Sequence, residues 1–151
     1  MLAAAAVAGW SGLPAVLAAA APISFAALIR ATWGTWTPSG TFGLANAVTT
    51  VRLGLTLGLL AGGLSLSAWT LTLLGVVVIH LDGIDGWAAR RFGTQGDFGA
   101  RYDVAVDSVF ALSLSVVLLA RGSLQPWVLI AGAWYYVYVL APLVLVTQRA
   151  E

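Results

Sequence analysis

The sequence has no cysteine and no lysine, and it has few charged residues of any kind. Without cysteine, neither disulfide bridges nor thiol chemistry can operate in this protein. Only 9% of the residues are charged, whereas 60% are hydrophobic and the mean hydropathy is +0.94. These values lie well outside the range of soluble globular domains, and the apolar runs are long enough to cross a bilayer. The chain is therefore predicted to be an integral membrane protein.

The apolar runs predict an all-α, polytopic transmembrane helical bundle with about five membrane segments. The segments lie near residues 14–30, 44–63, 66–90, 103–120 and 124–147. A chain of 151 residues suits one such bundle without a separate soluble domain. We divide it into an N-terminal apolar span with an interfacial connector, residues 1–43, and a core, residues 44–151.

The N-terminal residues 1–29 have no charged side chain. A signal peptide needs a positively charged start before its apolar core, so a retained span or a short re-entrant pair is favoured over a cleaved leader. Residues 31–43 are polar and glycine-rich, and Trp33 and Trp36 are suited to the headgroup level. This stretch is predicted to be an interfacial connector.

The arginines are distributed unevenly about the predicted segments. If each segment crosses the membrane once, six arginines lie on one side and Arg121 lies on the other. The positive-inside rule then makes the six-arginine side cytoplasmic and places the acidic residues there. The six are Arg30, Arg52, Arg90, Arg91, Arg101 and Arg149.

Five of the six acidic residues fall between Asp82 and Asp107. Ionised carboxylates at membrane depth are costly unless something compensates them, so the cluster suggests bound cations and function. If these segments are helical, four of the acids form two stripes, one on each helix, together with small residues. The loop between the two helices is short, so we expect the helices to be antiparallel neighbours with their stripes facing each other. The stripes are Asp82, Asp85, Gly86 and Ala89 on the first helix and Gly99, Asp103 and Asp107 on the second.

Four converging carboxylates would repel one another, and protonation would abolish their value as ligands. Divalent cations relieve this repulsion. Oxygen ligands with only His80 as a nearby nitrogen donor favour Mg²⁺, Mn²⁺ or Ca²⁺ over zinc or copper. His80 itself is more simply an ordinary interfacial histidine than a partner of the aspartates. Hard cations with open coordination positions are a standard means of holding a diphosphate while a P–O bond breaks.

The pattern Asp82-x2-Asp85-Gly86-x2-Ala89-Arg90-x8-Gly99-x3-Asp103-x3-Asp107 resembles the complete signature of the CDP-alcohol phosphotransferase (CDP-alcohol phosphatidyltransferase) family. Upstream, Asn46-x2-Thr49-x2-Arg52 resembles an element that often opens the family's first core helix. The resemblance implies that an acceptor alcohol attacks the β-phosphorus of a CDP-linked donor, usually CDP-diacylglycerol, with release of CMP. This reaction belongs to phospholipid biosynthesis.

The resemblance also implies a role for each motif residue. Asp82, Asp85 and Asp103 would bind a pair of Mg²⁺ or Mn²⁺ ions. Asp107 would be the general base and would also touch a metal; beside a cation it would be ionised near neutrality. Gly99 would allow close helix approach. The remaining motif positions would line the nucleotide and diphosphate region, and they are Asn46, Thr49, Arg52, Gly86, Ala89 and Arg90.

The resemblance is incomplete at the C-terminal end, where relatives have further core helices. We therefore expect a reduced or truncated member, or a bundle that a neighbouring copy completes, since family members are commonly homodimers. The expected partners are the CDP-linked lipid donor, a small alcohol acceptor and membrane lipids, with no nucleic acid. The acceptor cannot be read from the motif, although the scarcity of basic residues after Arg101 disfavours a phosphorylated acceptor bound by one subunit alone.

Three other interpretations compete with this one. An intramembrane prenyltransferase also uses acidic helices and magnesium, but its acidic pairs usually lie far apart in sequence. A small cation or proton transporter predicts acids spread through membrane depth, whereas here they gather at one end. An inactive relative would keep the motif without turnover. Simple helix capping would explain one or two of the acids, such as Asp97, but not two matched stripes.

Overall fold

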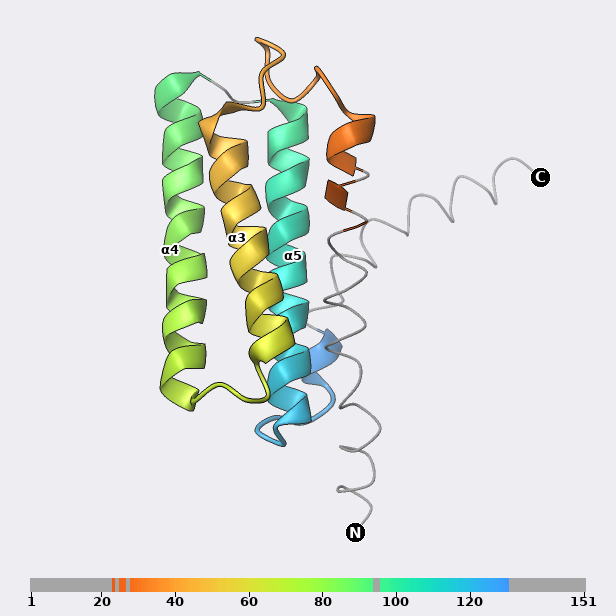
Figure 1. Ribbon diagram of the computed structural model, residues 1–151, viewed down its shortest axis with the longest axis vertical. Helices are drawn as coiled ribbons and strands as arrows, with labels where there is room; N and C mark the ends of the chain where they lie inside the picture. Colours follow the sequence, from red (N-terminus) through yellow and green to blue (C-terminus); the bar gives the residue numbers. More distant parts are fainter. Residues whose placement is uncertain (1–22, 24, 27, 94–95, 131–151) are drawn as a thin grey trace, which may run out of the picture.

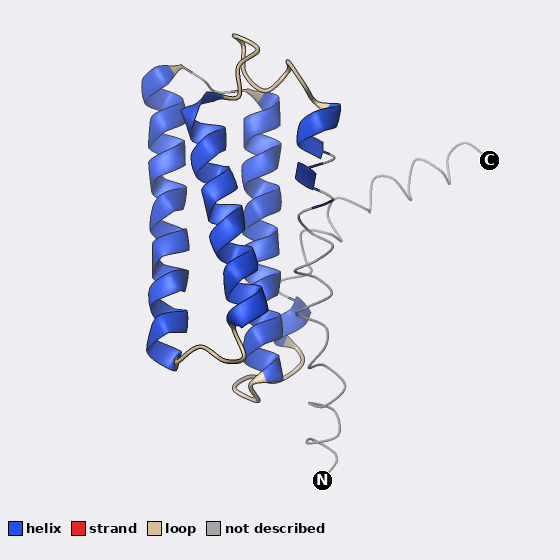
Figure 2. Ribbon diagram, in the orientation of Figure 1, coloured by secondary structure: helices blue, strands red, loops and turns tan. Residues whose placement is uncertain are grey.

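The computed structural model describes residues 23, 25–26, 28–93 and 96–130. Three long helices dominate this part of the chain, α3 (Gly43–Gly62), α4 (Ala68–Phe92) and α5 (Asp97–Ala120). They run alternately up and down, so the start of α3, the end of α4 and the start of α5 lie at the same end of the bundle (Figure 1). Figure 2 shows only helices and loops in the described residues.

Each of the three helices is long and apolar enough to cross a membrane. At 1.5 Å per residue they are about 30–38 Å long, which matches the thickness of a bilayer core. Among the described residues the structure is all-helical with three candidate membrane-spanning helices, and α3, α4 and α5 correspond to the three central predicted segments. The predicted segments 14–30 and 124–147 lie mostly outside the described residues; their described parts include short helical stretches at residues 28–30 and 128–130.

The boundaries of α4 follow from local capping. The Ser67 hydroxyl accepts a hydrogen bond of 3.1 Å from the backbone N–H of Thr70, which satisfies one free donor of the first turn. At the other end Gly93 adopts the left-handed conformation (φ 62°), and its N–H donates to the carbonyl of Ala89. The whole stretch from Asp82 to Arg90 consequently lies on one unbroken helix.

The fourth predicted segment, 103–120, begins earlier than expected, because α5 starts at Asp97. Gly96 is extended, and the carboxylate of Asp97 lies in the first turn, where it interacts favourably with the helix dipole. Asp97 thus has the local helix-end environment expected of it. Because the helix starts here, Gly99, Asp103 and Asp107 all lie within α5.

Helix α3 packs against both α4 and α5, whereas contacts between α4 and α5 are sparse (Figure 1). The two acidic helices do run antiparallel, as predicted, but each packs mainly against α3 and only loosely against the other. Like charges on the two helices repel each other, and the cation that both rows contact belongs to α3. At the far end, α3 and α5 approach closely at Gly63, where an added Cβ would lie 2.6 Å from the side chain of Val117.

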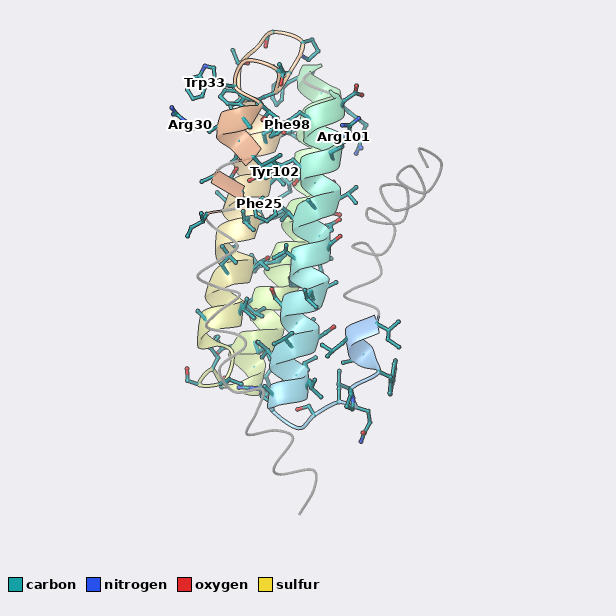
Figure 3. All side chains as sticks on the ribbon, turned by 90° about the vertical axis from the view of Figure 1, so that its right-hand side faces the viewer. Phe25, Arg30, Trp33, Phe98, Arg101 and Tyr102 are labelled. Atoms are coloured by element: carbon teal, nitrogen blue, oxygen red, sulfur yellow. The ribbon has the colours of Figure 1, made fainter. Side chains whose placement is uncertain are left out.

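An aromatic group joins the start of α3 to α5 near the site end of the bundle. Tyr102 is buried, its ring stacks on Phe98 at 5.4 Å, and its hydroxyl lies 3.1 Å from that of Thr50. Figure 3 shows Phe25, Phe98 and Tyr102 together at this end. In the connector, Trp33 is exposed, whereas Trp36 is buried and its indole N–H donates to the carbonyl of Ile29.

Candidate active site

Four aspartates from α4 and α5 converge on a single arginine of α3. The Nη1 nitrogen of Arg52 lies 2.7 Å from Oδ2 of Asp85 and 2.6 Å from Oδ1 of Asp103. Its Nη2 nitrogen lies 2.9 Å from Oδ1 of Asp82 and also hydrogen-bonds to Oδ1 of Asp107. The two predicted acidic stripes do face a common point, and the side chain at that point is a guanidinium.

This cluster lies inside the helices and not in the loop that joins them. Arg52 and Asp107 are each about 13–15 Å from the start of their helices at 1.5 Å per residue. Acids that only cap helix ends would lie within the first or last turn. Capping therefore does not explain the four aspartates. Asp97 does lie in the first turn of α5, but the N-cap is Gly96 and no side chain caps this helix end by a hydrogen bond.

The donor set fits a hard divalent cation. Asp82, Asp85 and Asp103 each offer a carboxylate oxygen, and these atoms lie within 4.8 Å of one another. Arg52 offsets one of the formal negative charges of the four carboxylates. Three formal negative charges therefore remain uncompensated in an apolar bundle. Oxygen-only ligands of this kind suit Mg²⁺ or Mn²⁺. An aspartate cluster of this type is typical of the metal site in the family that the sequence resembles.

The four carboxylates differ in their surroundings. The side chain of Asp85 is buried, and its Oδ2 accepts hydrogen bonds from both Thr49 and Arg52. The side chains of Asp82, Asp103 and Asp107 are 45%, 37% and 49% exposed. These three retain carboxylate surface that Arg52 does not cover and that a bound ligand can reach.

A cavity of about 250 Å³ lies between the three helices and extends from the acidic cluster to the start of α5. Asp85 and Asp103 form its acidic end, and the other walls consist mainly of small and neutral polar residues. Six of the seven residues predicted to bind substrate line it; Arg52 does not. The complete lining is Ala45, Asn46, Thr49, Asp85, Gly86, Ala89, Arg90, Gly96, Gly99, Ala100 and Asp103.

Two glycines of the motif make room for polar side chains at this cavity. A Cβ added at Gly99 would lie 3.1 Å from Oδ1 of Asn46, whose Nδ2 donates to the carbonyl of Phe42. A Cβ added at Gly86 would lie 3.4 Å from Nη1 of Arg90. Gly99 therefore permits the predicted close approach, and it does so towards α3.

Sequence reasoning missed the central position of Arg52. The available signal was that Arg52 is the one charged residue between Arg30 and Asp82, in the middle of an apolar span. A lone charge at such depth requires a counter-charge, and the four aspartates supply it. Ala45, Gly96 and Ala100 were also missed, because small residues carry no chemical signal of their own.

His80 lies outside the cluster. Its ring is exposed, and Nδ1 lies 2.8 Å from the carbonyl oxygen of Val76 on the same helix. This geometry agrees with the interpretation of His80 as an ordinary interfacial histidine.

Comparison with known proteins gives one match. The family model described as CDP-alcohol phosphatidyltransferase matches residues 42–151, well over half of the chain. The matched region contains α3, α4 and α5, the acidic cluster and every residue that lines the cavity. No match was found among curated proteins or among solved structures.

Proposed function

We propose that this chain, which belongs to the CDP-alcohol phosphatidyltransferase family, transfers a phosphatidyl group from CDP-diacylglycerol to a small alcohol and releases CMP. Family membership establishes the enzyme class, a CDP-alcohol phosphotransferase. The identity of the donor is our proposal. Its main support is the arrangement of four aspartates beside a cavity whose walls are the motif residues expected to hold a nucleotide.

In the proposed reaction, the acceptor hydroxyl oxygen forms a bond to the β-phosphorus of the donor. The bond from that phosphorus to the oxygen bridging the α-phosphate breaks, and CMP leaves with the electron pair. The proton of the acceptor hydroxyl passes to Asp107. Its position supports this role, because Asp107 lies outside the compact three-acid group and is the most exposed of the four carboxylates.

The proposed metal ligands are Asp82, Asp85, Asp103 and Asp107, and the proposed ions are a pair of Mg²⁺ or Mn²⁺. When bound, such ions would neutralise the diphosphate and the charge that develops on the leaving phosphate. Thr49 would orient Asp85 through its hydrogen bond. Among the expected substrate-binding residues, Arg52 contacts the acids directly, and its contact with the diphosphate remains a prediction.

The cavity indicates which part of the donor is held between the helices. Pockets that enclose a whole drug-sized ligand usually measure about 300–1,000 Å³. A volume of about 250 Å³ suits the polar nucleotide portion, with the acyl chains remaining outside. Asn46 and Arg90 would supply polar contacts, and Gly86, Ala89 and Gly99 would give the nucleotide room.

We further propose that the whole chain has five membrane segments, with the division at residues 43/44 given above, and that it functions as a homodimer among membrane lipids. The active site would face the cytoplasm. Support comes from the distribution of arginines: Arg30 and Arg101 lie at the cavity end (Figure 3), whereas Arg121 lies at the other end and bonds to the carbonyl of Leu66.

The experiment is to incubate the purified full chain with CDP-diacylglycerol, Mn²⁺ and a panel of alcohols that includes glycerol phosphate, inositol phosphate and serine. We expect CMP and a new phosphodiester lipid with one of them. Release of pyrophosphate from a prenyl diphosphate would instead support a prenyltransferase. Ion flux in liposomes without nucleotide turnover would support a transporter, and the position of all four acids around one guanidinium argues against it.

A further inference from the structure

Arg52 joins the two acidic helices in pairs. Nη1 contacts Asp85 of α4 and Asp103 of α5, while Nη2 contacts Asp82 of α4 and Asp107 of α5. A guanidinium has five N–H donors, and two lie on each terminal nitrogen. The four terminal donors match the four carboxylates in number. The fifth, on Nε, has no hydrogen-bond partner among the described residues.

This pairing matters because α4 and α5 share few other contacts. Both helices pack along α3, and Arg52 forms all the ion pairs found within the described residues. The side chain is only 2% exposed, so it is held among the helices and does not exchange freely with solvent. Its removal would leave four carboxylates that repel one another, with no other cation of the described residues paired to them.

The same contacts place Arg52 in competition with a metal. Oδ1 of Asp103 and Oδ2 of Asp85 lie 2.6 and 2.7 Å from Nη1 of Arg52, and both residues belong to the three-acid group that fits a divalent ion. A carboxylate oxygen bonded to a guanidinium is a weaker ligand than a free one. A positive charge within a few ångströms also opposes the approach of a second cation.

We propose that Arg52 is a positioning residue that acts as an internal counter-cation: it holds the two acidic rows in register and gives up part of its contacts when a divalent ion binds. The inference rests on the proposed function, because that function requires the metal. Two opposite consequences follow from one side chain. Arg52 stabilises the metal-free bundle, and it lowers the affinity of the site for divalent cations.

The geometry of the guanidinium is specific to arginine. Its planar fork presents paired donors on two nitrogens, whereas lysine has one compact ammonium group with three donors. Lysine at position 52 would keep the charge but could not join both pairs of carboxylates at once. Arg52→Lys is therefore expected to be intermediate between the wild type and a neutral variant, both in Mn²⁺ affinity and in the stability of the metal-free protein.

The test compares Arg52→Gln, Arg52→Lys and the control Arg101→Gln in the purified full chain. Mn²⁺ binding is measured from the electron paramagnetic resonance signal of the free ion, and thermal unfolding is measured in EDTA and in saturating Mn²⁺. We expect Arg52→Gln to unfold at a lower temperature than the wild type in EDTA and to bind Mn²⁺ about tenfold more tightly. Saturating Mn²⁺ should therefore raise the unfolding temperature of Arg52→Gln by more than it raises that of the wild type. Arg101→Gln should match the wild type.

Each other outcome has a defined meaning. Wild-type Mn²⁺ affinity in Arg52→Gln, or loss of its Mn²⁺ binding, would overturn the inference and leave the proposed function in place. Failure of the wild type itself to bind Mn²⁺ would overturn the proposed function and the inference together. If Arg52→Gln does not fold, Arg52→Lys decides the question: affinity above that of the wild type supports the inference, and unchanged or weaker affinity contradicts it.

Discussion

Thr49 of α3 donates a hydrogen bond of 3.0 Å to Oδ2 of Asp85 on α4. The same hydroxyl lies 3.1 Å from the carbonyl of Ala45, but the charged carboxylate is the stronger acceptor. Asp85 is the one buried carboxylate of the cluster, so its orientation depends on such contacts. A residue of the short upstream element thus orients an acid of the main motif.

Thr49→Val removes this hydrogen bond while conserving shape. Partners of metal ligands typically contribute about 10–100-fold in affinity or activity, so we expect at least about tenfold weaker Mn²⁺ binding and a similar fall in kcat/KM. Thr56→Val is the matched control. Thr56 is also buried on α3, but its hydroxyl has no partner among the described residues, so its loss should leave activity unchanged and should not lower stability. Unaltered Mn²⁺ affinity in Thr49→Val would contradict the orienting role.

Asp107→Asn should abolish proton acceptance while the cavity stays intact. We expect kcat to fall by at least about 10²-fold, with nucleotide affinity retained, because general-base catalysis contributes about 10²–10⁴ in rate. The measurements are CMP release and calorimetric binding of a cytidine nucleotide. Asp97→Asn, in the exposed first turn of α5, should behave as the wild type. Retained turnover in Asp107→Asn would refute its assignment as the base.

Gly99→Ala should disturb the cavity wall. The added methyl group would lie 3.1 Å from Oδ1 of Asn46, so the amide of Asn46 must shift. The hydrogen bond from its Nδ2 to the carbonyl of Phe42 opposes that shift. We expect weaker binding of the CDP-linked donor, seen as a rise in KM, and a modest loss of helix packing. At Gly83 on α4 a Cβ meets nothing within 4 Å, so Gly83→Ala is the control. Equal kinetics in the two variants would show that the cavity tolerates the methyl group.

Gly63→Ala should destabilise the far end of the bundle. Its methyl group would lie 2.5 Å from the carbonyl oxygen of Leu59 and 2.6 Å from the side chain of Val117. Overpacking of this kind costs about 1–3 kcal/mol, and the melting temperature should fall. Gly58→Ala meets nothing within 4 Å and should raise stability slightly, because alanine is the better helix former. A melting temperature of Gly63→Ala at or above that of the wild type would show that α3 and α5 can separate there at little cost.

Much of the site was predictable because it depends on helical periodicity. Asp82 and Asp85 are three residues apart, and Asp103 and Asp107 are four apart, so each pair must share a helix face. The cavity lining was implied by the family resemblance and not by periodicity, and six of the seven expected substrate-binding residues do surround it. The neighbours of α4 were not predictable in this way. Periodicity gives the face of a helix, but it does not say which other helix that face meets.

The sequence by itself determined that the chain is a membrane protein, which stretches form the three described spans and which residues carry the acidic motif. These properties depend on composition and on spacing along one helix. Only the tertiary structure decided that α3 lies between the acidic helices and that Arg52 contacts all four carboxylates. The physical reason is that the charge balance of the cluster involves three helices, and their relative positions depend on how side chains far apart in sequence pack together.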